Sequence, residues 1–142
     1  MTDGFAWACE YGRTPVVAFL IQRGVDVGTK LRNHGQTGLH WAAFGGYPDT
    51  VRILLNARSP VNEKDPEFDG TPLGWALYAW GGGGPRPGSE LYYDVVAQLV
   101  AAGATVDPQW LDASSRGFPL ARRIQDDSRM RAALGHQRSA SY

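Results

Sequence analysis

Residues 37–46, TGLHWAAFGG, hold the pattern that decides the fold, because variants of it occur twice more in the chain. Tryptophans stand at positions 7, 41 and 75, so a spacing of 34 residues occurs twice. Each is followed directly by alanine and preceded two positions earlier by an apolar residue, as in FAWACEYG (5–12) and LGWALYAW (73–80). A fixed period of this length is typical of stacked repeat proteins.

A second apolar pattern follows each tryptophan. VVAFLIQRG (16–24), VRILLNARS (51–59) and VVAQLVAAG (95–103) place apolar residues at i, i+3 and i+4, which is one face of a short helix. Thr37 and Thr71 are predicted N-caps of the first helices, with Pro72 at the first helical position. Cap-like residues also precede the second helices, and Gly24 and Gly103 suit left-handed C-caps. Each unit is therefore predicted to be two short helices.

This pattern resembles the ankyrin repeat, in which T-P-L-H opens the first helix and G-A-D-V-N follows the second. The resemblance implies an all-α solenoid of stacked helix–turn–helix units. The chain departs from the pattern at the truncated start of its first unit, at Gly74 in place of His, and at Arg58 and Pro60 in place of Gly and Asp. The segments that carry the resemblance are TGLHWAAFGG (37–46) with LLNARSPVN (54–62), TPLGWAL (71–77) with LVAAGATVD (99–107), and WACEYG (7–12) with LIQRGVDV (20–27).

We expect a single domain over residues 1–135, followed by a frayed tail at 136–142. Apolar residues such as Ile124 and Met130 predict a divergent C-terminal cap with an Arg-rich outer face, in which Asp127 or Ser128 starts the last helix and Gly135 ends it. The expected parts are units at about 1–31, 32–65 and 66–107, a cap at 108–135, and a loop insertion at 81–91 inside the third unit.

Composition favours a soluble, globular domain, with 43% hydrophobic and 20% charged residues. No apolar run has the length of a membrane span, and the N-terminus does not read as a secretory signal. Cys9 is the only cysteine, which fits a cytoplasmic, intracellular protein, and we expect it to be a buried thiol.

The charges are distributed unevenly along the chain. Residues 1–115 carry 8 basic and 12 acidic residues, a net charge of −4, and residues 116–142 carry 6 basic and 2 acidic residues, a net charge of +4. A basic nucleic-acid-binding surface is therefore disfavoured, except at the C-terminal end.

None of the candidate chemical motifs predicts catalysis. The glycine run at 81–84 lacks the lysine of a phosphate loop and follows a predicted helix. His34, His40 and His136 have no partners at metal-ligand spacing, so no metal or cofactor is expected. The ankyrin resemblance implies that His40 bonds locally and ties neighbouring repeats together. The acids of EKDPEFD (63–69) are expected to be solvated.

The ankyrin resemblance also implies which residues face a partner. Trp7, Trp41 and Trp75 are expected to form an interior ladder, whereas Tyr11, Phe44 and Tyr78 are expected to line up on the exposed concave groove. Phe44 and Tyr78 packing against the turns is the alternative. Trp80 and Arg86 of the insertion are expected either to extend the groove or to belong to a floppy loop. The complete set of expected partner-binding residues is Glu10, Tyr11, Asn33, His34, Gln36, Phe44, Glu67, Phe68, Tyr78, Trp80 and Arg86.

We therefore expect a non-catalytic module that binds another protein through this groove. One alternative is a regulatory or targeting fragment of a larger protein, such as an enzyme. The other is a small-ligand or nucleic-acid site made by the aromatic groove and the Arg-rich cap. The sequence leaves the partner and the oligomeric state open.

Overall fold

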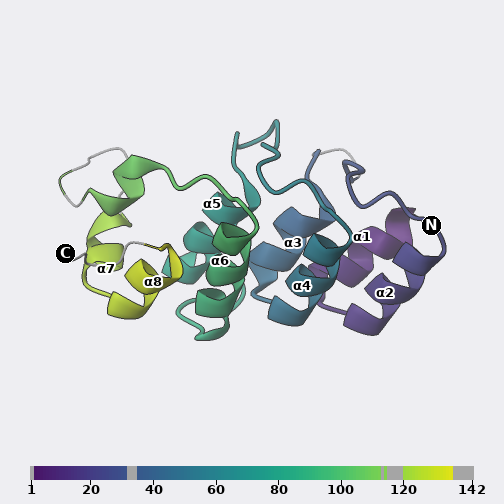
Figure 1. Cartoon of the computed structure of the whole chain (residues 1–142), viewed down its shortest axis with the longest axis horizontal. Coiled ribbons are helices and arrows are strands. Elements are labelled where there is room, and N and C mark those ends of the chain that lie inside the picture. The colour runs from purple at the N-terminus through teal and green to yellow at the C-terminus, as the bar shows by residue number, and fades with distance from the viewer. Residues whose placement is uncertain (1, 32–34, 113, 115–119, 136–142) are drawn as a thin grey trace.

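The computed structural model describes residues 2–31, 35–112, 114 and 120–135 (Figure 1). Within these residues there is no strand, only an isolated bridge between Leu31 and Gln36, so the predicted all-α solenoid is confirmed. In chain order the helices are α1 (Thr2–Glu10), α2 (Thr14–Gln22), α3 (Gly38–Gly45), α4 (Pro48–Asn56), α5 (Pro72–Tyr78), the π-helix η1 (Ala79–Gly83), α6 (Leu91–Ala101), the 3-10 helix η2 (Pro108–Leu111), α7 (Ala121–Gln125) and α8 (Ser128–Ala133).

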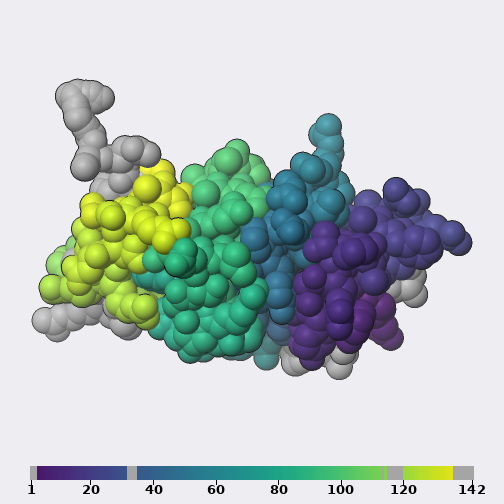
Figure 2. Space-filling view, turned by 90° about the horizontal axis from the view of Figure 1, so that it is seen from below, coloured from purple at the N-terminus to yellow at the C-terminus, as the bar shows by residue number. Residues whose placement is uncertain are grey.

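The first six α-helices form three hairpins that stack in chain order. Within the stack α1 packs on α3 and α3 on α5, while α2 packs on α4 and α4 on α6. Figures 1 and 2 show the units following one another along the long axis, from the purple N-terminal pair to the yellow C-terminal helices. Each hairpin therefore buries its apolar face against its neighbours, as in other solenoids.

Side-chain caps begin α3 and α5, the first helices of the second and third repeats, as predicted. The Thr37 hydroxyl accepts the N–H of His40, and the His40 ring accepts the N–H of Thr37, so the two residues form a reciprocal capping box. Thr71 likewise accepts the N–H of Gly74. The expected side-chain caps are missing from α2 and α4, where proline in the first turn favours the helix start instead. The Thr14 hydroxyl is bonded to the Thr50 hydroxyl at 2.7 Å.

The second helices end in left-handed residues at matching positions. Gly24 after α2 and Gly103 after α6 adopt φ values of 98° and 103°, which confirms the predicted C-caps. Arg58 stands at the same position after α4 and adopts φ 68°. A residue with a Cβ pays about 1–2 kcal/mol for this conformation, so the departure from glycine has a cost in stability.

Close packing between α1 and α3 explains why glycine stands at position 38, where T-P-L-H has proline. Cys9 and Phe5 are fully buried there, and burial raises the pKa of the Cys9 thiol to about 12, so the predicted buried thiol is confirmed. A Cβ placed on Gly38 would lie 2.7 Å from Cys9 Sγ and 3.1 Å from Phe5. Glycine lets the first two repeats approach this closely.

The insertion in the third repeat begins as helix, because η1 continues α5 without a break. Trp80 lies in η1 and is only 2% exposed, with its ring beside Tyr93. The Arg123 guanidinium lies over the Trp80 ring, 4.8 Å from its centroid. Arg123 also donates a hydrogen bond to the Gly81 carbonyl. The expectation that Trp80 extends an exposed groove is therefore wrong, because the C-terminal cap buries it.

The rest of the insertion folds back onto the α3–α4 turn. Arg86 donates to the carbonyl oxygens of Gly45 and Gly46, each at 2.7 Å, and its guanidinium lies 4.7 Å above the Tyr47 ring. The Tyr92 hydroxyl donates to the Phe44 carbonyl at 2.6 Å. The expectation that Arg86 is available to a partner is also wrong, because it clamps the third repeat to the second.

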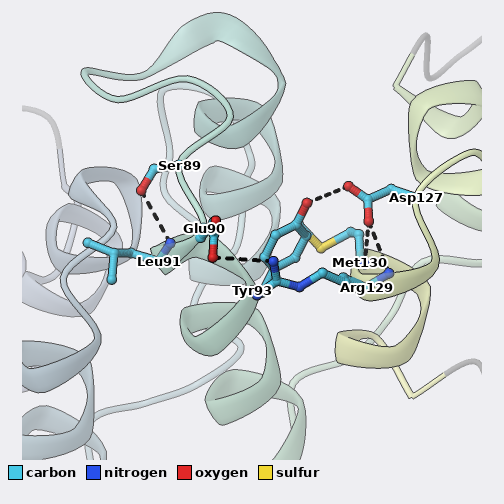
Figure 3. A network of polar contacts seen from close by, with 7 residues as sticks. All are labelled: Ser89, Glu90, Leu91, Tyr93, Asp127, Arg129 and Met130. Atoms are coloured by element: carbon cyan, nitrogen blue, oxygen red, sulfur yellow. Dashed lines mark hydrogen bonds and ion pairs between the residues drawn. The ribbon is translucent and has the colours of Figure 1, made fainter.

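The C-terminal cap is held to α6 by a polar network (Figure 3). The Tyr93 hydroxyl donates to Asp127 Oδ2 at 2.5 Å. Asp127 Oδ1 accepts the N–H groups of Arg129 and Met130, which confirms the predicted helix start at Asp127. The Arg129 guanidinium lies 4.3 Å from the Tyr93 ring and pairs with Glu90 at 3.3 Å. Cap arginines therefore cover aromatic rings of the third repeat in addition to facing solvent.

Candidate functional site

The turn between the second and third repeats is organised by a buried carboxylate. Asp65 is fully buried, and its Oδ2 accepts the N–H groups of Glu67 at 3.1 Å and Phe68 at 2.8 Å. Its Oδ1 accepts the N–H of Gly70 at 2.9 Å, and its own N–H donates to the Gly70 carbonyl. The expectation that all acids of residues 63–69 are solvated is wrong for Asp65, because the turn closes around it.

Two side chains from outside the turn complete the shell around Asp65. Gln36, at the start of the second repeat, donates from Nε2 at 3.2 Å, and Trp75 of α5 donates from its indole Nε1 at 3.0 Å. Burial opposes ionisation of Asp65, but the hydrogen bonds from the backbone, Trp75 and Gln36 outweigh it and lower the pKa of Asp65. A charged carboxylate therefore holds the turn, α5 and the preceding repeat in one geometry.

His40 makes the second link across the same junction. Its Nε2 lies 2.8 Å from the Gly70 carbonyl and its Nδ1 accepts the N–H of Thr37, which requires the neutral ring with the proton on Nε2. Burial lowers the pKa of His40 and favours this neutral form. The predicted role of His40 as a tie between neighbouring repeats is confirmed.

Four rings gather beside this junction and form what we call the aromatic shelf: Trp41, Phe44, Phe68 and Trp75. Trp75 is the centre, with ring centroids of Trp41, Phe44 and Phe68 at 5.4, 5.7 and 6.1 Å in edge-to-face arrangements. Phe68 is 69% exposed at the tip of the turn, and the other three rings are half-buried. Edge-to-face pairs at these distances are favourable, so the shelf is a fixed surface.

The predicted interior tryptophan ladder is therefore wrong in part. Trp41 and Trp75 do contact one another, but both remain partly exposed, and Trp7 is 44% exposed. Trp41 is covered on one side by Trp75 of the following repeat, which leaves part of its ring exposed. Trp7 packs against Tyr11 and under the Arg13 guanidinium instead.

The predicted aromatic row is not continuous. Tyr11 follows its repeat tryptophan by four residues and lies just past the end of α1, whereas Phe44 and Tyr78 follow theirs by three within α3 and α5, so Tyr11 does not occupy the same repeat position. Tyr11 and Tyr78 are exposed as expected, and Phe44 is half-buried in the shelf. The Tyr78 ring lies over Gly83 of η1, where an added Cβ would be 2.2 Å from it.

The remaining predicted site residues divide by accessibility. Glu67 is exposed and Glu10 is partly exposed. Gln36 is only 1% exposed because it is bonded to Asp65 and Glu67, so its expected place on the accessible groove is wrong. Asn33 and His34 lie outside the described residues, as does the predicted frayed tail.

Two residues that shape this surface were missed by repeat comparison. Asp65 has no acidic counterpart in the preceding unit, because Leu31 stands 34 residues before it. An acid at a position that is apolar in the preceding unit is the signal that would have found Asp65. Trp110 of η2 lies near α5, and a Cβ on Gly74 would be 3.7 Å from its ring. Gly74 therefore replaces the repeat histidine where Trp110 approaches the helix.

Within the described ranges, no three His, Cys, Asp or Glu side chains gather in a way that could hold a metal ion. In the same part of the chain, no helix has both the length and the apolar character needed to cross a bilayer.

Comparison with known proteins agrees with the geometry. The family model described as ankyrin repeats (3 copies) matches residues 5–109. The chain is 34% identical over 106 residues to the palmitoyltransferase Hip14 of Drosophila melanogaster, which is 75% of this chain and 14% of that protein. It is 38% identical over 84 residues to the palmitoyltransferase AKR1 of Kluyveromyces lactis, covering 59% and 9%. Alpha-latrotoxin-Lhe1a of Latrodectus hesperus is 38% identical over 71 residues, covering 49% and 5%. The chain thus spans a small part of the length of these curated relatives.

We expect Asp65→Asn to lower the free energy of unfolding by about 1–3 kcal/mol at pH 7, because the new amide turns an N–H donor toward N–H groups. The folded-state pKa of Asp65 is lowered, so its stabilisation is present above the unfolded value of about 3.9 and is lost as the pH falls through the folded pKa. Urea unfolding at pH 7 and below pH 4 measures both effects, and the variant should lose less stability on acidification.

Asp69→Asn is the matched control, because Asp69 is an exposed acid of the same turn and Asn tolerates its positive φ. Its free energy of unfolding should stay within about 0.5 kcal/mol of the wild type. Equal stability of the two variants would show that Asp65 does not organise the turn.

Proposed function

Because the chain belongs to the ankyrin-repeat family, we propose that it is a non-catalytic module that binds a partner protein through the aromatic shelf and the adjoining first helices. The observation that carries the proposal is Phe68, a large apolar side chain exposed at the tip of a turn that Asp65 holds in place. Exposed aromatic residues on a rigid support are typical of binding hot spots. Tyr78 adds a second exposed ring, one helical turn beyond Trp75.

The mechanism of binding rests on preorganisation. The Phe68 backbone is bonded to Asp65, and the rings beneath it are fixed by edge-to-face contacts, so little conformational entropy is lost when a partner docks. Glu67 and Asp69 flank Phe68 and are exposed. A partner segment with an apolar anchor and basic neighbours complements this surface.

The C-terminal cap supports a protein partner over a nucleic acid. Arg123 and Arg129, which the sequence offers as a basic surface, lie over the rings of Trp80 and Tyr93. Their guanidinium groups therefore contribute to the fold as well as facing solvent. The single buried thiol of Cys9 is consistent with the cytoplasmic setting that we propose for this module.

A second candidate function is a regulatory or targeting role within a larger protein. The palmitoyltransferase relatives favour it, because the similarity covers 14% and 9% of their lengths. An immunoblot of the source cells with an antibody against this domain tests it. A band far above 15.5 kDa is expected, and a band only at that mass removes this candidate.

For the proposed binding surface, we expect the double variant Phe68→Ala and Tyr78→Ala to stay folded and to lose its specific partners at least tenfold in a quantitative pull-down. Each truncation removes an exposed anchor, and such anchors contribute about 1–2 kcal/mol or more. Circular dichroism and urea unfolding check that the fold persists.

Leu91→Ala is the matched control, since Leu91 is an exposed apolar residue at the start of α6 and is not one of the shelf residues. It should retain the partners that the wild type captures. Equal capture of those partners by the double variant would contradict the proposed surface.

A further inference from the structure

The outer side of the first hairpin exposes apolar residues that the other repeats bury. Val16 is 39% exposed, whereas Thr50 and Val95 at the same position of the second and third repeats are fully buried. Phe19 is 53% exposed on the same face of α2, one turn further along. Leu20 is partly exposed, although its counterparts Leu54 and Leu99 are fully buried.

In the second and third repeats this face packs on the preceding hairpin. Thr50 bonds to Thr14 of the first repeat, and Gln98 donates to the Pro48 carbonyl of the second at 3.0 Å. Gly38 lies against Cys9, as described above, but a Cβ on the corresponding Gly4 would meet only Leu20, at 4.0 Å. Figures 1 and 2 place α1 and α2 at one end of the solenoid. The first hairpin therefore presents a repeat-type stacking surface with no described residue on it.

Charges at the edge of this surface show which occupant fits. Asp3 is exposed in the first turn of α1, and Arg23 is exposed just past α2, with its guanidinium 5.3 Å above the Phe19 ring. The start of α1 and the end of α2 lie at the same end of the hairpin. A two-fold axis parallel to the helices brings α1 of one copy against α2 of another, so Asp3 of each copy meets Arg23 of the other.

We propose that this face binds a second copy of the chain and forms a two-fold symmetric dimer across the first hairpins. The apolar stripe of Val16, Phe19 and Leu20 in each copy packs against α1 of the other, with the Asp3–Arg23 pairs at the rim. A head-to-tail contact lacks a matching partner, because α7 and α8 cover the opposite end of the solenoid (Figure 1).

Sedimentation velocity of the 142-residue chain over roughly 1 to 100 μM tests the proposal. The weight-average mass should rise from 15.5 kDa toward twice that value with concentration. Phe19→Asp should hold the protein at the monomer mass throughout, because it places a charge in the apolar stripe. Phe68→Asp is the control at the unrelated shelf and should associate like the wild type, which separates this proposal from the proposed function.

A charge exchange tests the orientation of the two copies. Asp3→Arg alone should weaken association roughly two- to tenfold, and adding Arg23→Asp to it should restore the wild-type affinity. A monomer at every concentration overturns the proposal and leaves the face to a helix pair of another protein or of a longer form of this chain. Dimerisation that survives Phe19→Asp, or a double exchange that stays as weak as Asp3→Arg, also overturns it.

Discussion

The buried carboxylate of Asp65 is the interaction on which the central part of this molecule depends. It accepts N–H groups from its own turn, from Gln36 of the preceding repeat and from the Trp75 indole of the following helix. Burying a charge is costly unless hydrogen bonds compensate, and here donors converge on both oxygens. The same set of bonds fixes the junction between two repeats and the position of the aromatic shelf.

The rest of the fold adds further ties between neighbours. His40 reaches the Gly70 carbonyl, Arg86 reaches back to the α3–α4 turn, and Tyr93 holds the cap through Asp127. Stability in a solenoid is close to a sum of such nearest-neighbour terms. The second and third repeats have these ties on both sides, whereas the first hairpin has them on one side. That difference leaves Val16 and Phe19 of α2 exposed.

Sequence reasoning predicted what recurs in every repeat. The tryptophan period placed the helix pairs, and Thr37, Thr71 and Gly103 marked helix ends correctly, because capping chemistry is local. Sequence reasoning failed where the residues that surround a side chain are distant from it in the sequence. Trp80 looked available because the cap that buries it arrives about 40 residues later, with Arg123.

The candidate surface was predicted in outline only. Phe68 and Tyr78 are exposed as the repeat alignment implied, but Gln36 faces a buried acid that has no equivalent in the other units. Comparison between repeats marks Asp65 only as an acid at the apolar Leu31 position, and it does not show which groups that acid binds. Which residues contact a partner stays a proposal.

The most direct test of the central claim is a double-mutant cycle between Asp65→Asn and Trp75→Phe, measured by urea unfolding at pH 7. Trp75→Phe removes the indole N–H that Asp65 accepts while keeping an aromatic ring in the shelf. If Asp65 couples the turn to the third repeat, the two losses of stability will fail to add, by about 0.5–3 kcal/mol. Losses that add to within about 0.3 kcal/mol would contradict the account.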